Sequence, residues 1–184
     1  PTYLMHLAVG TSFGIIIPTS IVSVLTHHQH NAVDFKVVQG YGIFVILGVI
    51  LGTVLAAGLK TKPLILFFTI VVYILAFYLL FLKEKESNLS IKMGLPAKII
   101  SGIITAIPAG FAAGLFGIGG GLITVPILFY IFGSIGIEPT YLMHLAVGTS
   151  FGIIIPTSIV SVLTHHQHNA VDFKVVQGYG IFVI

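Results

Sequence analysis

The sequence contains no cysteine and no arginine, and charged residues of any kind are scarce. Without cysteine, disulfide bonds and thiolate metal sites are excluded. Charged residues make up 7% of the chain, whereas about a quarter of the residues of a soluble globular protein are charged. Hydrophobic residues make up 57%. The composition therefore indicates a chain that lies in a lipid bilayer, and it gives no support for nucleic-acid binding.

The apolar residues form long continuous stretches. Lys, Asp and Glu are absent from residues 1–33, 37–59, 63–82 and 99–137. Each stretch is as long, or nearly as long, as the roughly 20 apolar residues of a membrane-spanning helix. None alternates at the period of two that marks a membrane strand. We therefore expect an all-α, polytopic helical membrane protein.

The beginning of the chain is repeated at its end. Residues 1–46 recur, residue for residue, as residues 139–184. Natural repeats usually diverge, because a fold tolerates many substitutions that keep volume and pattern. The identity therefore implies a very recent duplication, an engineered fusion or an error of sequence assembly. The chain reads as a 138-residue unit followed by part of a second copy.

We predict a division of the chain in its longest polar connection. Residues 1–88 hold three expected spans and form the end of a four-helix unit. Residues 89–184 hold a glycine-broken span, the repeated first span and a truncated second span. The expected spans cover residues 5–27, 37–59, 64–82 and 143–165, and the third, which has no glycine, is expected to face lipid.

A glycine cluster interrupts the apolar stretch 99–137. Its members are Gly117, Gly119, Gly120 and Gly121. The cluster predicts a helix over residues 98–116, a break, and a second helix over residues 122–132. Non-helical backbone inside a membrane is found where it lines a cavity, and free N–H groups at a helix start favour an anion. The alternative is a packing stripe formed by Gly110, Gly114, Gly117 and Gly121, which are three or four residues apart.

The orientation of the spans follows from the lysines if the broken stretch crosses the membrane once. Two identical copies are then expected to insert in the same direction. Lys36 and Lys174 fall on one side with the lysines of residues 83–98, and this richer side is predicted to be cytoplasmic. Lys60 and Lys62 fall on the other side.

Hydroxyl side chains form a second candidate site. Thr11 and Ser12 precede Pro18 in the first copy, and Thr149 and Ser150 hold the same place in the second. Hydroxyls near a proline break can donate to an oxyanion, or they can satisfy the carbonyls that the proline leaves free. The sequence is compatible with both roles.

These motifs resemble a known family of membrane transporters. Residues 114–121 read GLFGIGGG and are followed by Val125 and Pro126. The segments Gly148 to Ser150, His165 to His166 and Ala170 to Asp172 then follow in the order found in the TauE/SafE sulfite exporter family, which the chain resembles. The resemblance implies export or uptake of small sulfur-containing or carboxylate anions across a bacterial inner membrane. It also implies two four-helix halves, each with a glycine cluster, whereas this chain has one cluster.

Histidines offer two further hypotheses. His6 and His144 lie one to two turns before the hydroxyl segments and are candidates for proton coupling, because an ionisable residue within a span suggests a function. An HHxH pattern at residues 27–30, repeated at 165–168, could hold zinc or copper. A solvated turn at the end of a helix explains that pattern more simply.

The leading hypothesis is a secondary transporter of small anions such as sulfite, sulfonates or related organic acids. The alternative is a non-transporting fragment or a membrane assembly module packed through glycine stripes. No nucleophile, base and orienting residue occur together, so neither an enzyme, nor a resident metal, nor a cofactor is expected. The expected partners are the anionic substrate and the bilayer of a bacterial inner membrane, with a homo-oligomer left open.

Overall fold

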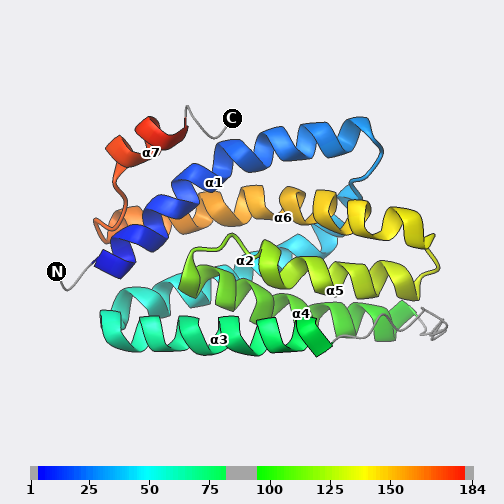
Figure 1. Cartoon of the computed structure of the whole chain (residues 1–184), viewed down its shortest axis with the longest axis horizontal. Helices are drawn as coiled ribbons and strands as arrows, with labels where there is room; N and C mark the ends of the chain where they lie inside the picture. Colours follow the sequence, from blue (N-terminus) through cyan, green and yellow to red (C-terminus); the bar gives the residue numbers. More distant parts are fainter. Residues whose placement is uncertain (1–3, 82–94, 181–184) are drawn as a thin grey trace.

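The computed structural model describes residues 4–81 and 95–180 and shows seven helices and no strand among them (Figure 1). The helices are α1 (Leu4–Gln29), α2 (Phe35–Gly58), α3 (Thr61–Phe81), α4 (Leu95–Phe116), α5 (Gly121–Ser134), α6 (Pro139–Gln167) and α7 (Phe173–Gly180). The predicted all-α membrane fold is confirmed, as is the break after residue 116. Residues 82–94, which hold the predicted division between 88 and 89, lie outside the described residues.

Local sequence explains where several helices start and continue. The carboxylate of Asp34 accepts hydrogen bonds from two backbone N–H groups at the start of α2, and Asp172 does the same at the start of α7. A proline opens α6, where its missing N–H costs no helical hydrogen bond. Pro18 and Pro156 lie inside α1 and α6, which continue through them without a break.

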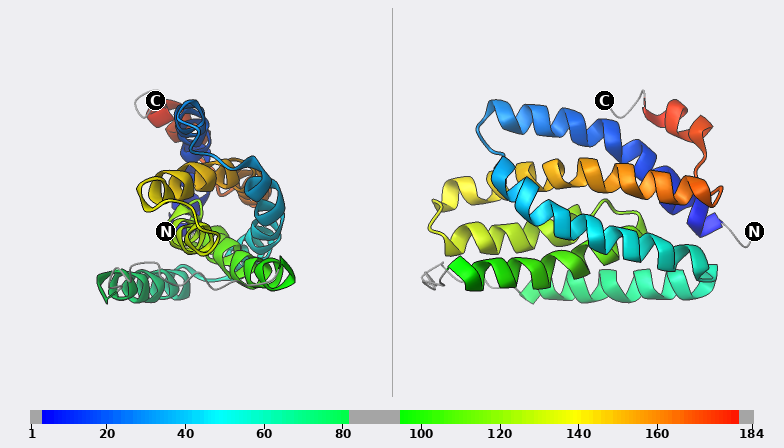
Figure 2. Two further views of the ribbon diagram at one scale, coloured as in Figure 1. Left: turned by 90° about the vertical axis from the view of Figure 1, so that its right-hand side faces the viewer. Right: turned by 180° about the vertical axis from the view of Figure 1, so that it is seen from behind.

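Helix length and surface both fit a bilayer. Among the described residues, α1, α2 and α6 are long and apolar enough to cross a membrane, while α3, α4 and α5 contribute shorter apolar stretches. Helix α3 lies at the edge of the bundle (Figure 2, left). Its described side chains are mostly exposed and large, from Ile65 to Leu80, and Leu64 is the one that is fully buried. In water this surface would be unfavourable, so the expected lipid-facing role of this helix fits the structure.

Glycines bring α2 and α4 into backbone contact. A Cβ atom added to Gly48 would meet the carbonyl oxygen of Ile107, and one added to Gly52, four residues later, would meet the carbonyl oxygen of Phe111. Gly110 makes the reciprocal contact from α4, with the carbonyl oxygen of Val45. The contacts advance in the same direction along both helices, so α2 and α4 run parallel. Close approach through small residues is the usual way to join helices where lipid supplies no hydrophobic drive. Part of the predicted glycine stripe therefore serves packing.

The repeated segments pack against each other in opposite directions. A Cβ added to Gly10, near the start of α1, would meet the backbone of Ala170, just after α6. Equally, a Cβ added to Gly148 in α6 would meet the backbone of Ala32, just after α1. The two copies are therefore related by a pseudo-two-fold axis between α1 and α6. The expectation that identical copies share one orientation is wrong.

The reversal arises at the glycine break. Figures 1 and 2 show the chain turning back after α4, so that α5 runs beside α4 in the opposite direction. Residues 99–137 thus form a helical hairpin and not the single crossing predicted. Lys174 consequently lies at the end of the bundle that carries Lys60 and Lys62, opposite Lys36. The described lysines therefore no longer distinguish one membrane face from the other.

Candidate functional site

The break between α4 and α5 is a buried loop of left-handed glycines. Gly117, Gly119 and Gly120 have φ angles of +72°, +65° and +82°, and all three are buried. An L-residue other than Asn or Asp rarely adopts such angles, so this turn requires glycine. Gly121 then begins α5. Figure 1 shows that the loop lies inside the bundle, short of the ends reached by α3 and α6.

The loop presents backbone N–H groups that no acceptor among the described residues uses. Within the described residues, the N–H of Gly117 donates to Ala113, and those of Ile123 and Thr124 donate to Gly120. The N–H groups of residues 118–122, by contrast, make no hydrogen bond within the described part of the chain. They lie at the positive end of the α5 dipole, a combination that favours an anion. Of these residues, Gly119 and Gly120 are buried, and buried N–H groups seldom remain unsatisfied without a functional reason.

Ser12 holds the loop against α1. Its Oγ lies 2.7 Å from the carbonyl oxygen of Gly117 and 2.8 Å from that of Val9, so one hydroxyl proton is shared between the two acceptors. Ser150 is the equivalent residue of the second copy, and its Oγ donates a hydrogen bond of 2.7 Å to the carbonyl oxygen of Val147 in the same helix. The structure thus brings Ser12, but not Ser150, into contact with the glycine loop.

The two threonines anchor turns. The hydroxyl of Thr11 accepts a hydrogen bond of 3.0 Å from the N–H of Asp172, and that of Thr149 accepts an equal one from the N–H of Asp34. Each threonine belongs to one copy and each aspartate to the other. These bonds fix the turns before α2 and α7 to the central helix pair and give both threonines a structural partner.

The two histidines proposed for proton coupling differ in environment. His6 is buried, and its Nε2 lies 2.8 Å from the carbonyl oxygen of Ala56 at the end of α2. His144, with the same sequence around it, is exposed on α6. The structure therefore places His6 inside the bundle, whereas His144 lies on its surface.

His165, which was expected to lie in a solvated turn, is instead buried inside the bundle. His165 is 1% exposed, and its ring stacks on Phe13 with centroids 6.1 Å apart. Its Nε2 has no hydrogen-bond partner within residues 4–81 and 95–180. Its copy His27 is only half-buried and stacks on Phe151 at 6.0 Å. Phe13 and His27 lie two heptads apart and therefore share one face of α1, but nothing in the sequence indicates that this face packs against its copy on α6.

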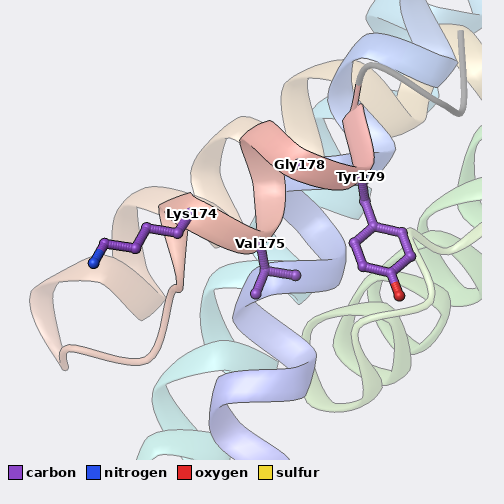
Figure 3. Close-up of a pocket in the computed structure, with 4 residues that line it drawn as sticks. All are labelled: Lys174, Val175, Gly178 and Tyr179. Carbon is purple, nitrogen blue, oxygen red and sulfur yellow. The ribbon is translucent and has the colours of Figure 1, made fainter.

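The remaining clusters give weaker indications of a site. No group of three His, Asp or Glu side chains within residues 4–81 and 95–180 is placed to hold a metal ion. A surface hollow of about 430 Å³ is lined by Lys174, Val175, Gly178 and Tyr179 (Figure 3). All four belong to α7, and none belongs to the glycine loop. The loop with Ser12 is therefore the candidate site that geometry supports best.

Comparison with known proteins decides the family. The family described as sulfite exporter TauE/SafE matches residues 2–136 and 102–184. The chain belongs to the TauE/SafE family. Both matches include the glycine break, so the segment that the geometry singles out lies inside the family pattern.

Two curated proteins resemble parts of this TauE/SafE chain. A probable membrane transporter protein of Haemophilus influenzae is 45% identical over 69 residues, which are 38% of this chain and 26% of the relative. A probable membrane transporter protein of Methanocaldococcus jannaschii is 39% identical over 80 residues, which are 44% of this chain and 28% of the relative. The matched segments thus span little more than a quarter of each relative. No solved structure matches the chain.

Proposed function

We propose that this TauE/SafE chain contributes the substrate site of a secondary transporter for small anions such as sulfite, sulfonates or related organic acids. The observation that carries the proposal is the buried loop of residues 117–121. Discontinuous helices whose second half begins at such a loop form substrate sites near the middle of transporters. Membership of the family and the names of both relatives support a membrane transporter.

The electrostatics of the loop favour an anion without a fixed countercharge. Helices α1, α5 and α6 contain no Lys, Asp or Glu. An anion beside the loop would therefore be bound by N–H groups, hydroxyls and the dipole of α5 alone. These donors are neutral, so the anion would be held weakly enough to be released after each crossing. Such a site suits oxygen acceptors better than a cation, because N–H groups and a helix start offer no lone pairs.

The packing suggests which parts move. Glycines bring the backbones of α2 and α4 into contact, whereas α2 meets α6 through side chains at Gly42 and Gly152, and α5 also packs on α6. We infer that transport involves movement of the α1–α6 pair relative to the α2–α4 pair around the loop, as one bundle rocks against another in similar architectures. We propose that the transporter lies in a bacterial inner membrane.

A non-transporting assembly module is the second candidate. The backbone contacts of Gly48 and Gly110 favour it, because they show that some of the glycines serve packing. The three glycines with positive φ do not fit a packing stripe, since straight helices need no left-handed residues. Anion-dependent flux separates the two functions.

The test is sulfite flux into proteoliposomes, with Gly120→Ala compared against Gly136→Ala. Both glycines have similar φ angles, +82° and +85°, so alanine brings a similar backbone strain of about 1–2 kcal/mol at each. A Cβ at Gly120 would lie 3.2 Å from Ala113 inside the loop, whereas Gly136 has open space around it. We expect Gly136→Ala to retain flux and Gly120→Ala to lose at least nine-tenths of it. Equal flux in both variants would remove the loop from the mechanism.

A further inference from the structure

A seam with heptad spacing joins α1 to α6. Phe13 stacks on His165 at one end of the seam, and His27 stacks on Phe151 at the other. The members on α1 are therefore residues 13, 20 and 27, and those on α6 are residues 165, 158 and 151. Positions seven residues apart lie on the same helix face. Antiparallel pairing of the two ends places Ser20 opposite Ser158 at the centre, where the pseudo-two-fold axis passes.

Both central serines are enclosed and unsatisfied. Ser20 and Ser158 are each 0% exposed, and neither hydroxyl has a hydrogen-bond partner among the residues that the structure describes. Three threonine hydroxyls on the same helices behave differently, since Thr19, Thr26 and Thr164 donate to carbonyls of their own helices. An unsatisfied hydroxyl in a membrane interior is costly, so two at one place call for an explanation.

The glycine loop reaches the same place. A Cβ on Gly119 would lie 3.3 Å from Ile16 and 3.3 Å from Ile154, which are equivalent residues of the two copies. Each isoleucine lies four residues, or about one helical turn of 5.4 Å, before its serine. The row of unsatisfied polar atoms also continues along α6 through Ser161 and His165 toward the turn that precedes α7.

We propose that the hydroxyls of Ser20 and Ser158 form a pair of hydrogen-bond donors that binds a small oxyanion on the pseudo-two-fold axis, beside the glycine loop. This inference rests on the proposed transport function and specifies its site. Two equivalent donors on opposite sides of an axis match an anion with at least two oxygen acceptors. Carboxylates, sulfite and sulfonates have this property, whereas a halide does not.

The first test measures anion binding to the full chain in detergent by thermal unfolding. The probes are sulfite, acetate and chloride at equal ionic strength, and the variants are Ser20→Ala, Ser158→Ala and the double variant. We expect each single variant to weaken sulfite binding about tenfold, which corresponds to about 1.4 kcal/mol. The controls Thr26→Val and Thr164→Val remove hydroxyls that already have partners and should leave sulfite binding unchanged.

The second measurement needs no anion. Because neither serine hydroxyl makes a hydrogen bond, Ser20→Ala and Ser158→Ala should leave the melting temperature unchanged or raise it. A clear drop in both would show that the hydroxyls are structural and would overturn the proposal. Unchanged sulfite affinity in the double variant would also overturn it, while leaving the transport function intact. If the unaltered chain responds to no oxyanion, both the transport function and this site are wrong.

Discussion

The hydrogen bond from Ser12 to the glycine loop allows a sharp test of the site, because the chain contains its own control. Ser12→Ala removes the one hydroxyl that contacts the carbonyl of Gly117. Ser150→Ala makes the same change in an identical local sequence, where the hydroxyl contacts only Val147 of the same helix. Effects on helix propensity cancel when the two variants are compared.

The expected difference follows from the partners that are lost. A typical hydrogen bond contributes about 0.5–1.5 kcal/mol, and a buried group left unsatisfied costs roughly 1–3 kcal/mol. The carbonyl of Gly117 has no other donor in the described residues, so we expect Ser12→Ala to destabilise the chain by about 1–2 kcal/mol. For a chain of this size, that corresponds to a melting temperature lower by roughly 2–8 °C. Ser150→Ala should change stability by less than about 0.5 kcal/mol, since alanine is the better helix former.

The assay is thermal unfolding of both variants, purified in one detergent and followed by the loss of helical circular dichroism. A second readout is flux in proteoliposomes, which should fall in Ser12→Ala and persist in Ser150→Ala. Equal losses of melting temperature would refute the reasoning, because they would show that the bond to Gly117 contributes nothing beyond local helix effects.

Two further predictions concern the topology and the packing. The chain has no cysteine, so His30→Cys and His168→Cys each introduce a single reactive thiol. These two exposed positions should react with a membrane-impermeant maleimide from opposite faces of the membrane. Labelling of both from one face would disprove the antiparallel pairing. Gly48→Ala should destabilise the chain by about 1–3 kcal/mol, because its Cβ meets backbone, whereas Gly40→Ala, in open space on the same helix, should stabilise it by up to about 1 kcal/mol. Similar melting temperatures for these two glycine variants would contradict the close approach of α2 and α4.

The sequence predicted the helices well because hydropathy and glycine spacing act locally. The break after Phe116 was expected from the run of glycines, and the structure places it there. The path of the chain beyond the break was not predictable in the same way. It depends on the left-handed φ angles of three glycines, which composition does not specify, and on packing that turns the 14-residue α5 back along α4.

The burial of individual polar residues could not be predicted from the sequence for a related reason. His27 and His165 have identical neighbours in sequence, yet one is half-buried and the other 1% exposed. His6 and His144 show the same contrast. Because the local sequence is the same in each pair, tertiary packing alone produces the difference, and only a structure could show it.

The antiparallel pairing of identical segments also bears on how the chain enters the membrane. The two identical segments cross the bundle in opposite directions, so the residues of a segment do not by themselves determine its orientation in the membrane. The direction of the second copy is set by the number of turns between the copies, within residues 47–138. The orientation of the second copy therefore depends on whether the intervening chain makes an odd or an even number of turns. Deletion of the α4–α5 turn, which would replace the re-entrant hairpin by a single pass, is expected to reverse the orientation of every segment that follows.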